Sequence, residues 1–432
     1  MQPINTITKR SVLIVLLASF ASLAIAAPPS FTTLAALIDV ALRDNMDLQA
    51  AQHAVDGARA RLQQSGLGAN PRLELSGRND TLFGNDGEYA VSVGFSQEFP
   101  IAGRLARQQD VARVDVALAL AEIAQAERTL AGNIAVAYYR LQVLDRQVAA
   151  QDSLIGVDDG LLQVTRSRLR AAEVAETDVL TAQLELGRAR EQRVLLQTER
   201  ATQAAELNQL LGRHSDDALN IDTTLPAPDA LPDVATLQRQ ALAARPDLRT
   251  AFLIADRARA EQALAHAERW EDWTVGVGVE QDRLAVDGAP DQQASRAIGV
   301  SLSIPLPLRN NGQARSAEAV ASGAQANASV QALRFSIANE IARGHAEVTG
   351  LAQSLANIQR DLLPVGERNV AQVQQAYRQG LTPIFTLMQA QRQQAEAVQA
   401  NLDLLDRYLQ ALAALHTAAG TYTQGFVPSE GK

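Results

Sequence analysis

Residues 134–169 read IAVAYYR-LQVLDRQ-VAAQDSL-IGVDDGL-LQVTRSR-L, with an aliphatic residue at the start of every group of seven. A seven-residue spacing maintained over this length is typical of a coiled coil. The helical pattern extends from about Leu105 to Arg170, and at 1.5 Å per residue such a helix is roughly 95–100 Å long. Because a small globular domain is only about 30 Å across, we predict a rod.

The chain repeats itself. The heptad returns 207 residues later as Ile341, Val348, Leu355 and Leu362. Other features recur at offsets that drift only from 200 to 208, among them Asp47 with Asp247, Gly94 with Gly299, and Gly212 with Gly420. A nearly constant offset indicates that one folding unit was duplicated, so the two halves are expected to occupy equivalent places.

The N-terminus has the features of a secretory signal peptide. Lys9 and Arg10 precede an apolar run from Val12 to Ile25, and residues 24–26 offer small side chains for cleavage. The apolar run is too short for an ordinary membrane span. We therefore predict that residues 1–26 are a signal peptide and that the chain is exported.

Composition excludes several classes of protein. The chain has no cysteine, which rules out disulfides and thiolate metal sites. Its formal net charge of −9 argues against nucleic acid as a partner, because phosphate binding needs a basic face. Hydrophobic residues make up 47% of the chain but aromatic residues only 4%, which favours long helices packed through small side chains.

Other helices flank the rods. Each half is expected to open with one continuous helix, at about 33–64 and 234–269, and the return helices are expected at about 177–211 and 384–419. Glycine and proline also occur inside both rods. We predict a kink or discontinuity in each of them, at Gly156 and Gly160 in the first and at Pro364 and Gly366 in the second.

Between the opening helix and the rod, each half contains two short stretches that alternate apolar with small or polar residues. This pattern predicts strands, joined by the polar loops at 79–88 and 287–295. Four strands cannot close a barrel, but three chains would supply twelve, and an apolar outer face suits lipid. Trp270 and Trp273 fit either an interfacial belt or ordinary packing. The expected lipid-facing residues are Val91, Val93, Phe95, Val275, Val277, Val279, Ile298, Val300 and Leu302.

Five segments, in this order and spacing, resemble the TolC-type outer-membrane efflux proteins over nearly all of the chain after the signal peptide. They are QEFPIAGR (97–104), LNQLLG (207–212), ALAARPDL (241–248), IPLPL (304–308) and AYRQGLTP (376–383). The strand exits in the first and fourth segments are most similar to the CzcC-like branch, which serves heavy-metal exporters.

The resemblance implies a fold that is mainly α with a small β part. Three chains would form a homotrimer with a 12-stranded β-barrel in the outer membrane and a 12-helix α-barrel in the periplasm. The channel would be a passive exit duct and not an enzyme. Its partners would be outer-membrane lipid, a periplasmic adaptor (membrane fusion protein) and an inner-membrane pump of the RND type. The domains would be a first repeat at 27–213, a linker at 214–233, a second repeat at 234–425 and a tail at 426–432, which we expect to be frayed.

The resemblance also locates the periplasmic tip, where the descending helices turn. The positions expected to dock the adaptor are Ala172, Glu173, Thr177, Asp178, Gly380, Thr382 and Pro383. Gly380 can adopt a left-handed turn freely, whereas its counterpart Ala172 cannot. Related channels close with acidic rings from the second copy, but here those positions are Thr386 and Gln389. Asp178 is the remaining gate candidate, and the alternative is that it caps the return helix near the positive end of the helix dipole.

Catalytic, cofactor and metal sites are not expected. The five histidines include no pair at helical ligand spacing, and Gly276 and Gly278 lie within a strand pattern rather than a phosphate-binding loop. A metal-exporting channel needs no tight site, since tight binding opposes conduction. The main alternative is a soluble periplasmic coiled-coil adaptor or scaffold, in which the strands would form a small sandwich.

Overall fold

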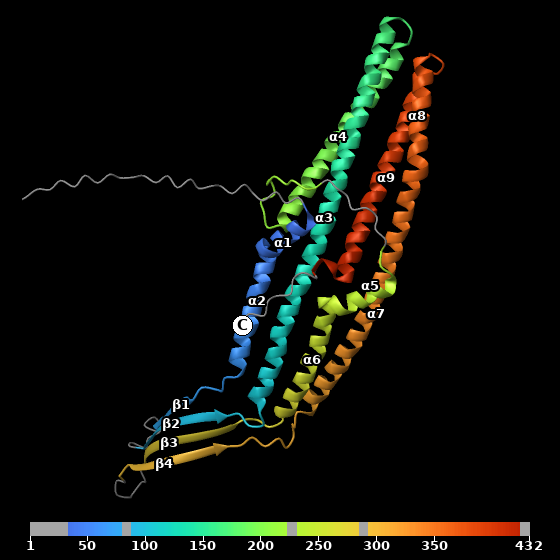
Figure 1. Ribbon diagram of the computed structural model, residues 1–432. Helices are drawn as coiled ribbons and strands as arrows, with labels where there is room; N and C mark the ends of the chain where they lie inside the picture. Colours follow the sequence, from blue (N-terminus) through green and yellow to red (C-terminus); the bar gives the residue numbers. More distant parts are fainter. Residues whose placement is uncertain (1–32, 80–87, 223–230, 285–292, 424–432) are drawn as a thin grey trace, which may run out of the picture.

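The computed structural model describes residues 33–79, 88–222, 231–284 and 293–423. The expected signal peptide and C-terminal tail, most of the two strand loops and part of the linker lie outside these ranges. The molecule is elongated, with a sheet at one end and two helical turns at the other (Figure 1). Within the described ranges, no helix is long and apolar enough to cross a bilayer.

Both halves follow the same order of elements, as a duplication requires. The first half contains α1 (Leu34–Asp44), α2 (Met46–Ser65), β1 (Arg72–Asn79), β2 (Tyr89–Phe99), α3 (Arg104–Arg170) and α4 (Glu176–Leu210). The second half contains α5 (Val234–Ala244), α6 (Pro246–Ala267), β3 (Trp273–Arg283), β4 (Ser295–Ser303), α7 (Gln313–Asn357), a π-helical segment (Ile358–Leu362), α8 (Leu363–Arg378), α9 (Ile384–Ala419) and a short 3₁₀ turn (Thr421–Thr423).

The prediction of one continuous opening helix in each half is wrong. Asn45 separates α1 from α2, and Arg245 separates α5 from α6, each with an extended backbone (ψ 124° and 121°). At Arg245 the cause is Pro246, which disfavours helical geometry in the residue before it. At Asn45 the side-chain oxygen instead accepts hydrogen bonds from the backbone N–H groups of Asp47 (2.9 Å) and Leu48 (3.1 Å), which caps α2.

The two rods differ. Helix α3 runs unbroken for 67 residues, so the discontinuity predicted at Gly156 and Gly160 is wrong. Glycine lowers helix propensity by only about 1 kcal/mol, which the packing of a long helix can outweigh. The second rod is interrupted as predicted: the π-helical segment ends two residues before Pro364, which has no backbone N–H to donate to a regular helical ladder.

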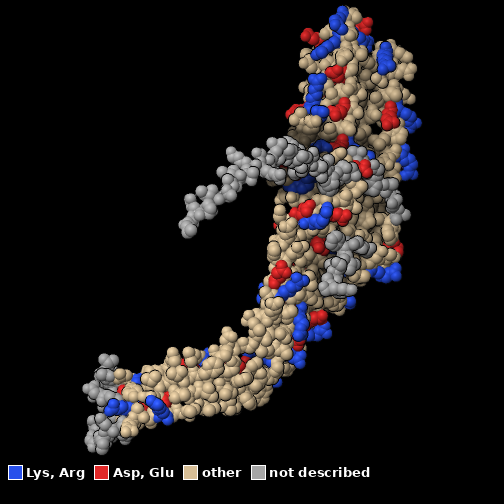
Figure 2. Space-filling model, turned by 60° about the vertical axis from the view of Figure 1, so that its left-hand side comes forward, with Lys and Arg blue, Asp and Glu red and all other residues tan. Residues whose placement is uncertain are grey.

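The four strands form a single antiparallel sheet in the order β1-β2-β3-β4. One register row joins Phe95, Val277 and Val300, and the adjacent row joins Gly94, Gly278 and Gly299. Side chains in adjacent rows point to opposite faces, so the register gives the sheet one apolar face and one face of small and polar residues, which also carries Glu74 and Glu280. On the side shown in Figure 2, the middle of the sheet carries few charged side chains, whereas the helical part carries many.

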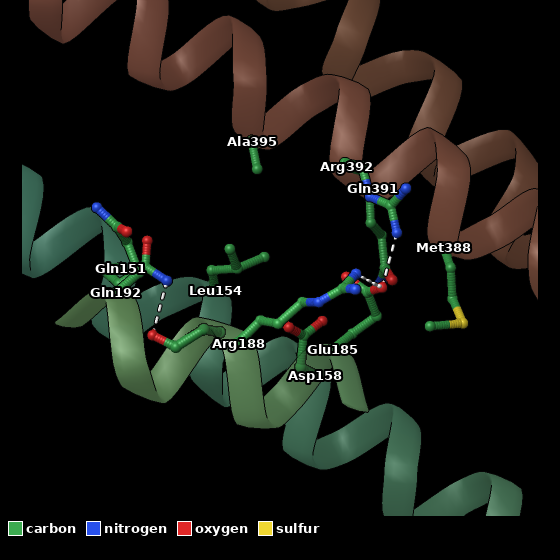
Figure 3. Close-up of a pocket in the computed structure, with 11 residues that line it drawn as sticks. Gln151, Leu154, Asp158, Glu185, Arg188, Gln192, Met388, Gln391, Arg392 and Ala395 are labelled. Atoms are coloured by element: carbon green, nitrogen blue, oxygen red, sulfur yellow. Dashed lines mark hydrogen bonds and ion pairs between the residues drawn. The ribbon is translucent and has the colours of Figure 1, made fainter. Parts of the chain in front are cut away.

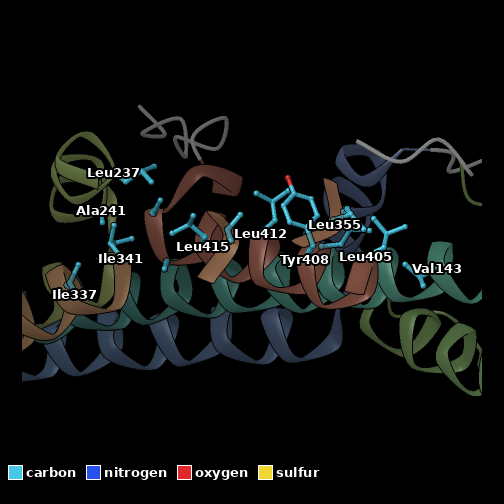
Figure 4. Packing of buried hydrophobic residues seen from close by; sticks show 14 of the residues in the cluster. Val143, Leu237, Ala241, Ile337, Ile341, Leu355, Leu405, Tyr408, Leu412 and Leu415 are labelled. Carbon is cyan, nitrogen blue, oxygen red and sulfur yellow. The ribbon is translucent and has the colours of Figure 1, made fainter. Parts of the chain in front are cut away.

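Four hydrophobic clusters stabilise the helical part, and the smallest joins Ala255 and Ala258 of α6 to Ala326 of α7. Two others lie at mid-length. One packs α7 and α9 against the short helix α5 (Figure 4), and the other packs α3 against the short helix α1. The fourth lies near the turns and includes Leu162 and Tyr377. The predicted heptad is fully buried at Ile134, Leu141 and Ile341, but Leu362 is 49% exposed, so the coiled-coil packing weakens between the middle and the turns.

Candidate functional site

The end of the molecule away from the sheet consists of two helical hairpins. The first hairpin is α3–α4 and the second is α8–α9. In the first, the N–H of Glu173 donates to the Arg168 carbonyl (2.9 Å); in the second, the N–H of Leu381 donates to the Ala376 carbonyl (2.9 Å). Both patterns are Schellman motifs, which place one residue in the left-handed conformation just after the helix.

The left-handed residues are Ala172 (φ 58°) and Gly380 (φ 75°). The sequence suggested that only Gly380 would take this conformation freely, and Ala172 takes it although its Cβ makes the geometry costly. The helix-ending hydrogen bonds therefore determine the turn in both hairpins, and the first turn carries backbone strain.

Replacing Ala172 by Gly is expected to relieve that strain. Because glycine loses more conformational entropy on folding, part of the gain is offset, and the net stabilisation of the turn is roughly 0.5–1 kcal/mol. Hydrogen exchange measured at the Glu173 amide would slow by about two- to fivefold, which corresponds to this free energy. Gly380→Ala is the reciprocal control and should accelerate exchange at Leu381. Equal rates in wild-type protein and Ala172→Gly would show that the turn is unstrained.

A groove between the two turns, which we call the tip groove, has a volume of about 360 Å³. It brings together five of the seven positions expected at the tip, from both copies: Glu173, Asp178, Gly380, Thr382 and Pro383. Ala172 and Thr177 are exposed and do not line it. Five of the positions expected at the tip therefore line one groove, and the other two lie outside it.

Arg168 and Tyr377 hold the two hairpins together across the tip groove. The Cζ atom of Arg168 lies 4.9 Å from the centre of the Tyr377 ring, and its Nη1 lies 3.5 Å from the Tyr377 carbonyl oxygen. Its Nε donates to Glu173 (3.0 Å), which raises the pKa of the Arg168 side chain. A guanidinium over an aromatic ring contributes about 0.5–1 kcal/mol at a partly exposed site.

Asp178 is the third residue of α4 and is half-buried in the tip groove. Its backbone N–H donates to the Ala175 carbonyl (3.1 Å). Among the described residues, no side-chain bond to a helix-end amide is found at the start of α4, so Asp178 does not act as a capping side chain. Its carboxylate still lies in the first turn, where the helix dipole favours a negative charge.

Further along the hairpins, a cavity lies between α3, α4 and α9 (Figure 3). Glu185 on α4 accepts hydrogen bonds from Arg188 (3.1 Å) and from Arg392 on α9 (2.7 Å), so this carboxylate joins the two hairpins. Burial, and then the neighbouring Glu185 carboxylate, raise the pKa of Asp158 to about 6. Because an acid with a raised pKa binds its proton more tightly in the folded state, the fold gains stability as the pH falls through about 6.

At the opposite end, the residues expected to face lipid lie on one face of the sheet. Most are about half exposed or more: Val91 51%, Val93 48%, Phe95 49%, Val277 51%, Val279 52%, Ile298 83%, Val300 76% and Leu302 58%. Val275 is only partly exposed. A contiguous exposed apolar face of this kind marks a surface that contacts another protein or a membrane.

The described residues contain no group of three or more histidine or acidic side chains placed to hold a metal ion.

Comparison with known proteins gives one family. A family model described as "Outer membrane efflux protein" matches residues 37–213 and 237–421. The two matched segments correspond to the two halves of the duplicated chain. The sequence has no significant match among curated proteins.

Solved structures share the fold at low sequence identity. The chain is similar to CusC, described as forming a transmembrane channel (20% identity, TM-score 0.72, covering 90% of this chain and 92% of that one). It is also similar to the outer membrane protein VceC of Vibrio cholerae (20% identity, TM-score 0.68, covering 90% of this chain and 96% of that one). A third similar structure is the CmeC outer membrane channel of Campylobacter jejuni (15% identity, TM-score 0.71, covering 99% of this chain and 96% of that one).

Proposed function

The chain belongs to the outer membrane efflux protein family, and from this we propose that it is the outer-membrane duct of a tripartite efflux system. Three copies would join their sheets into a 12-stranded barrel and their helices into a 12-helix periplasmic tunnel. A periplasmic adaptor would dock at the tip positions, and an inner-membrane pump, which we propose is of the RND type, would deliver the solute.

The sheet carries this proposal. It has an exposed apolar face, a face of small and polar residues, and two edge strands, β1 and β4, each of which pairs with only one other strand in the part of the chain that the structure describes. An open edge of this kind is a liability in water and promotes pairing with another chain. Edge-to-edge assembly of three sheets would satisfy both edges and turn the apolar faces toward lipid.

The competing interpretation, a soluble periplasmic scaffold, explains the long helices equally well. It does not explain the sheet, because a sandwich would bury the apolar face and Ile298 is 83% exposed. A heavy-metal cargo is the finer proposal. It is supported by the similarity of the strand exits at 97–104 and 304–308 to those of the CzcC-like branch, with the cation as transported solute.

Asp178 is the proposed gate residue. In a trimer it would contribute a ring of three carboxylates, which favours cations over anions. Asp178→Ala is expected to reduce the cation preference or to raise single-channel conductance in planar bilayers. Glu176→Ala removes an exposed acid from the same helical turn and is the matched control. Unchanged currents in Asp178→Ala would show that Asp178 is not a gate residue and that its carboxylate only interacts favourably with the helix dipole of α4.

The proposal as a whole is tested by fractionating a Gram-negative host and measuring the mass of the native assembly. Native mass spectrometry is preferable to amine-reactive crosslinking, because the chain contains only two lysines, Lys9 and Lys432. A trimer in the outer-membrane fraction is the expected result. A soluble periplasmic monomer or dimer would overturn the duct and support the scaffold.

A further inference from the structure

The core is interrupted between the middle of the molecule and the turns. On α9, the only buried residues between Met388 and Leu402 are Ala390 and Gln391. On the facing stretch of α3, residues 148–161, no described side chain is fully buried. Protein interiors are normally close-packed, so an interruption that spans both helices leaves space between them.

Part of this space is a groove of about 420 Å³ lined by α3, α8 and α9, which we call the seam groove. Its walls include Leu154, Val370 and Val398, and its polar groups include the amides of Gln374 and Gln394. No charged side chain lines it. This absence is informative because 20% of the chain is charged. The neighbouring cavity between α3, α4 and α9, in contrast, is lined by two arginines and two acidic residues.

The chemistry of the lining selects the ligand. A volume of this size lies within the range of small-molecule sites, about 300–1,000 Å³, and such sites combine apolar walls with a few polar groups. An ion would lose its hydration without gaining a compensating charge. A neutral molecule would lose little, and glutamine amides can both donate to and accept from its polar group.

We propose that the seam groove binds an uncharged small molecule that carries an amide or hydroxyl group on an apolar body. Gln391 contributes to recognition. It is only 8% exposed, lies on the wall shared by the seam groove and the cavity of Figure 3, and its side-chain amide makes no hydrogen bond to another described residue. This amide is therefore available both to donate a hydrogen bond to a ligand and to accept one from it.

Binding would also stabilise the arrangement of the two hairpins. The seam groove takes its lining from α3 of the first hairpin and from α8 and α9 of the second, so a bound molecule contacts both. A ligand that binds only this arrangement favours it by mass action. The seam groove lies within one chain, and ligand binding there depends neither on conduction nor on the identity of the exported solute.

The test is photolabelling of the full-length, detergent-purified assembly with 4-benzoylbenzamide, a neutral benzophenone amide. Saturable labelling is expected in peptides covering residues 150–157 or 391–399. The matched anionic probe, 4-benzoylbenzoate, should label these peptides on the order of tenfold less at equal concentration. Ala395→Leu, which places a larger side chain in the groove, should reduce labelling by a similar factor, and Gln391→Leu should reduce it severalfold.

Ala400→Leu is the control, because Ala400 is exposed on the same helix and does not line the groove. Each variant is first checked for wild-type helical content and assembly mass. Equal labelling by both probes, or labelling insensitive to Ala395→Leu, would overturn the proposal. It would also be overturned if the assembly remained unlabelled and Ala395→Leu dissociated it, because a second copy would then fill the groove.

Discussion

Val93→Arg and Val277→Arg are each expected to abolish assembly in the outer membrane. Both side chains lie on the apolar face of the sheet, where they are 48% and 51% exposed. A lipid-facing arginine costs about 2–4 kcal/mol at the membrane midplane. If the chain assembles as a trimer, each substitution is present three times, so the cost for the assembly is threefold.

The matched control is Ser92→Arg, because Ser92 neighbours Val93 in β2 but points to the other face, where its hydroxyl lies 2.7 Å from that of Ser76. Assembly is measured as the amount of heat-modifiable oligomer in the outer-membrane fraction. Loss in both valine variants with retention in Ser92→Arg would identify the lipid-facing side. Normal assembly of Val93→Arg and Val277→Arg would show that the apolar face of the sheet does not contact lipid.

The long helices were predictable because their signal is local and repeated. The return helix expected at 384–419 is α9 with the same bounds, and the rod expected from about Leu105 to Arg170 is α3. In both cases a regular apolar spacing continues for many turns, and α9 also ends at a glycine, Gly420. The strands were predictable for the same reason, since alternation over a few residues determines which face each side chain occupies.

The breaks at Asn45 and Arg245 were not predicted, because the apolar periodicity continues across them. At Arg245 the signal was present in the following proline. At Asn45 the local signal is an asparagine, a residue that caps helices, but it stands within a continuous helical pattern. Its side-chain Nδ2 also donates to the Leu210 carbonyl (3.1 Å), a contact 165 residues away that no local rule contains.

At the tip, too, some features follow from the order of residues along the chain and others depend on contacts between distant residues. Duplication and the resemblance gave the positions expected at the tip, because both depend on the order of residues along the chain. Arg168 and Tyr377 were missed as a pair, since they are 209 residues apart and each has an ordinary local role in its own helix. Only the packing of one hairpin against the other brings the guanidinium over the ring.

Gly212→Ala is expected to be the most destabilising single-methyl substitution at the ends of these helices. Gly212 follows α4 with φ +71°, and a Cβ at this position would lie 2.5 Å from the Asp44 carbonyl oxygen. That oxygen belongs to the last residue of α1, directly before the break at Asn45. Backbone strain of about 1 kcal/mol would add to overpacking of about 1–3 kcal/mol against a carbonyl that cannot rotate away.

Two other glycines with nearly the same backbone provide the controls. Gly380 (φ +75°) has nothing within 4 Å of a built Cβ, and Gly420 (φ +76°) would meet the Cβ of Ala244 at 3.0 Å. Because the conformational strain is shared, the thermal unfolding midpoint, followed by circular dichroism, should fall least for Gly380→Ala, more for Gly420→Ala and most for Gly212→Ala. Equal shifts in the three variants would mean that strain alone acts and that the contact between α4 and α1 relaxes freely. The expected gradient would instead show that close backbone packing against the α1–α2 break requires glycine at position 212.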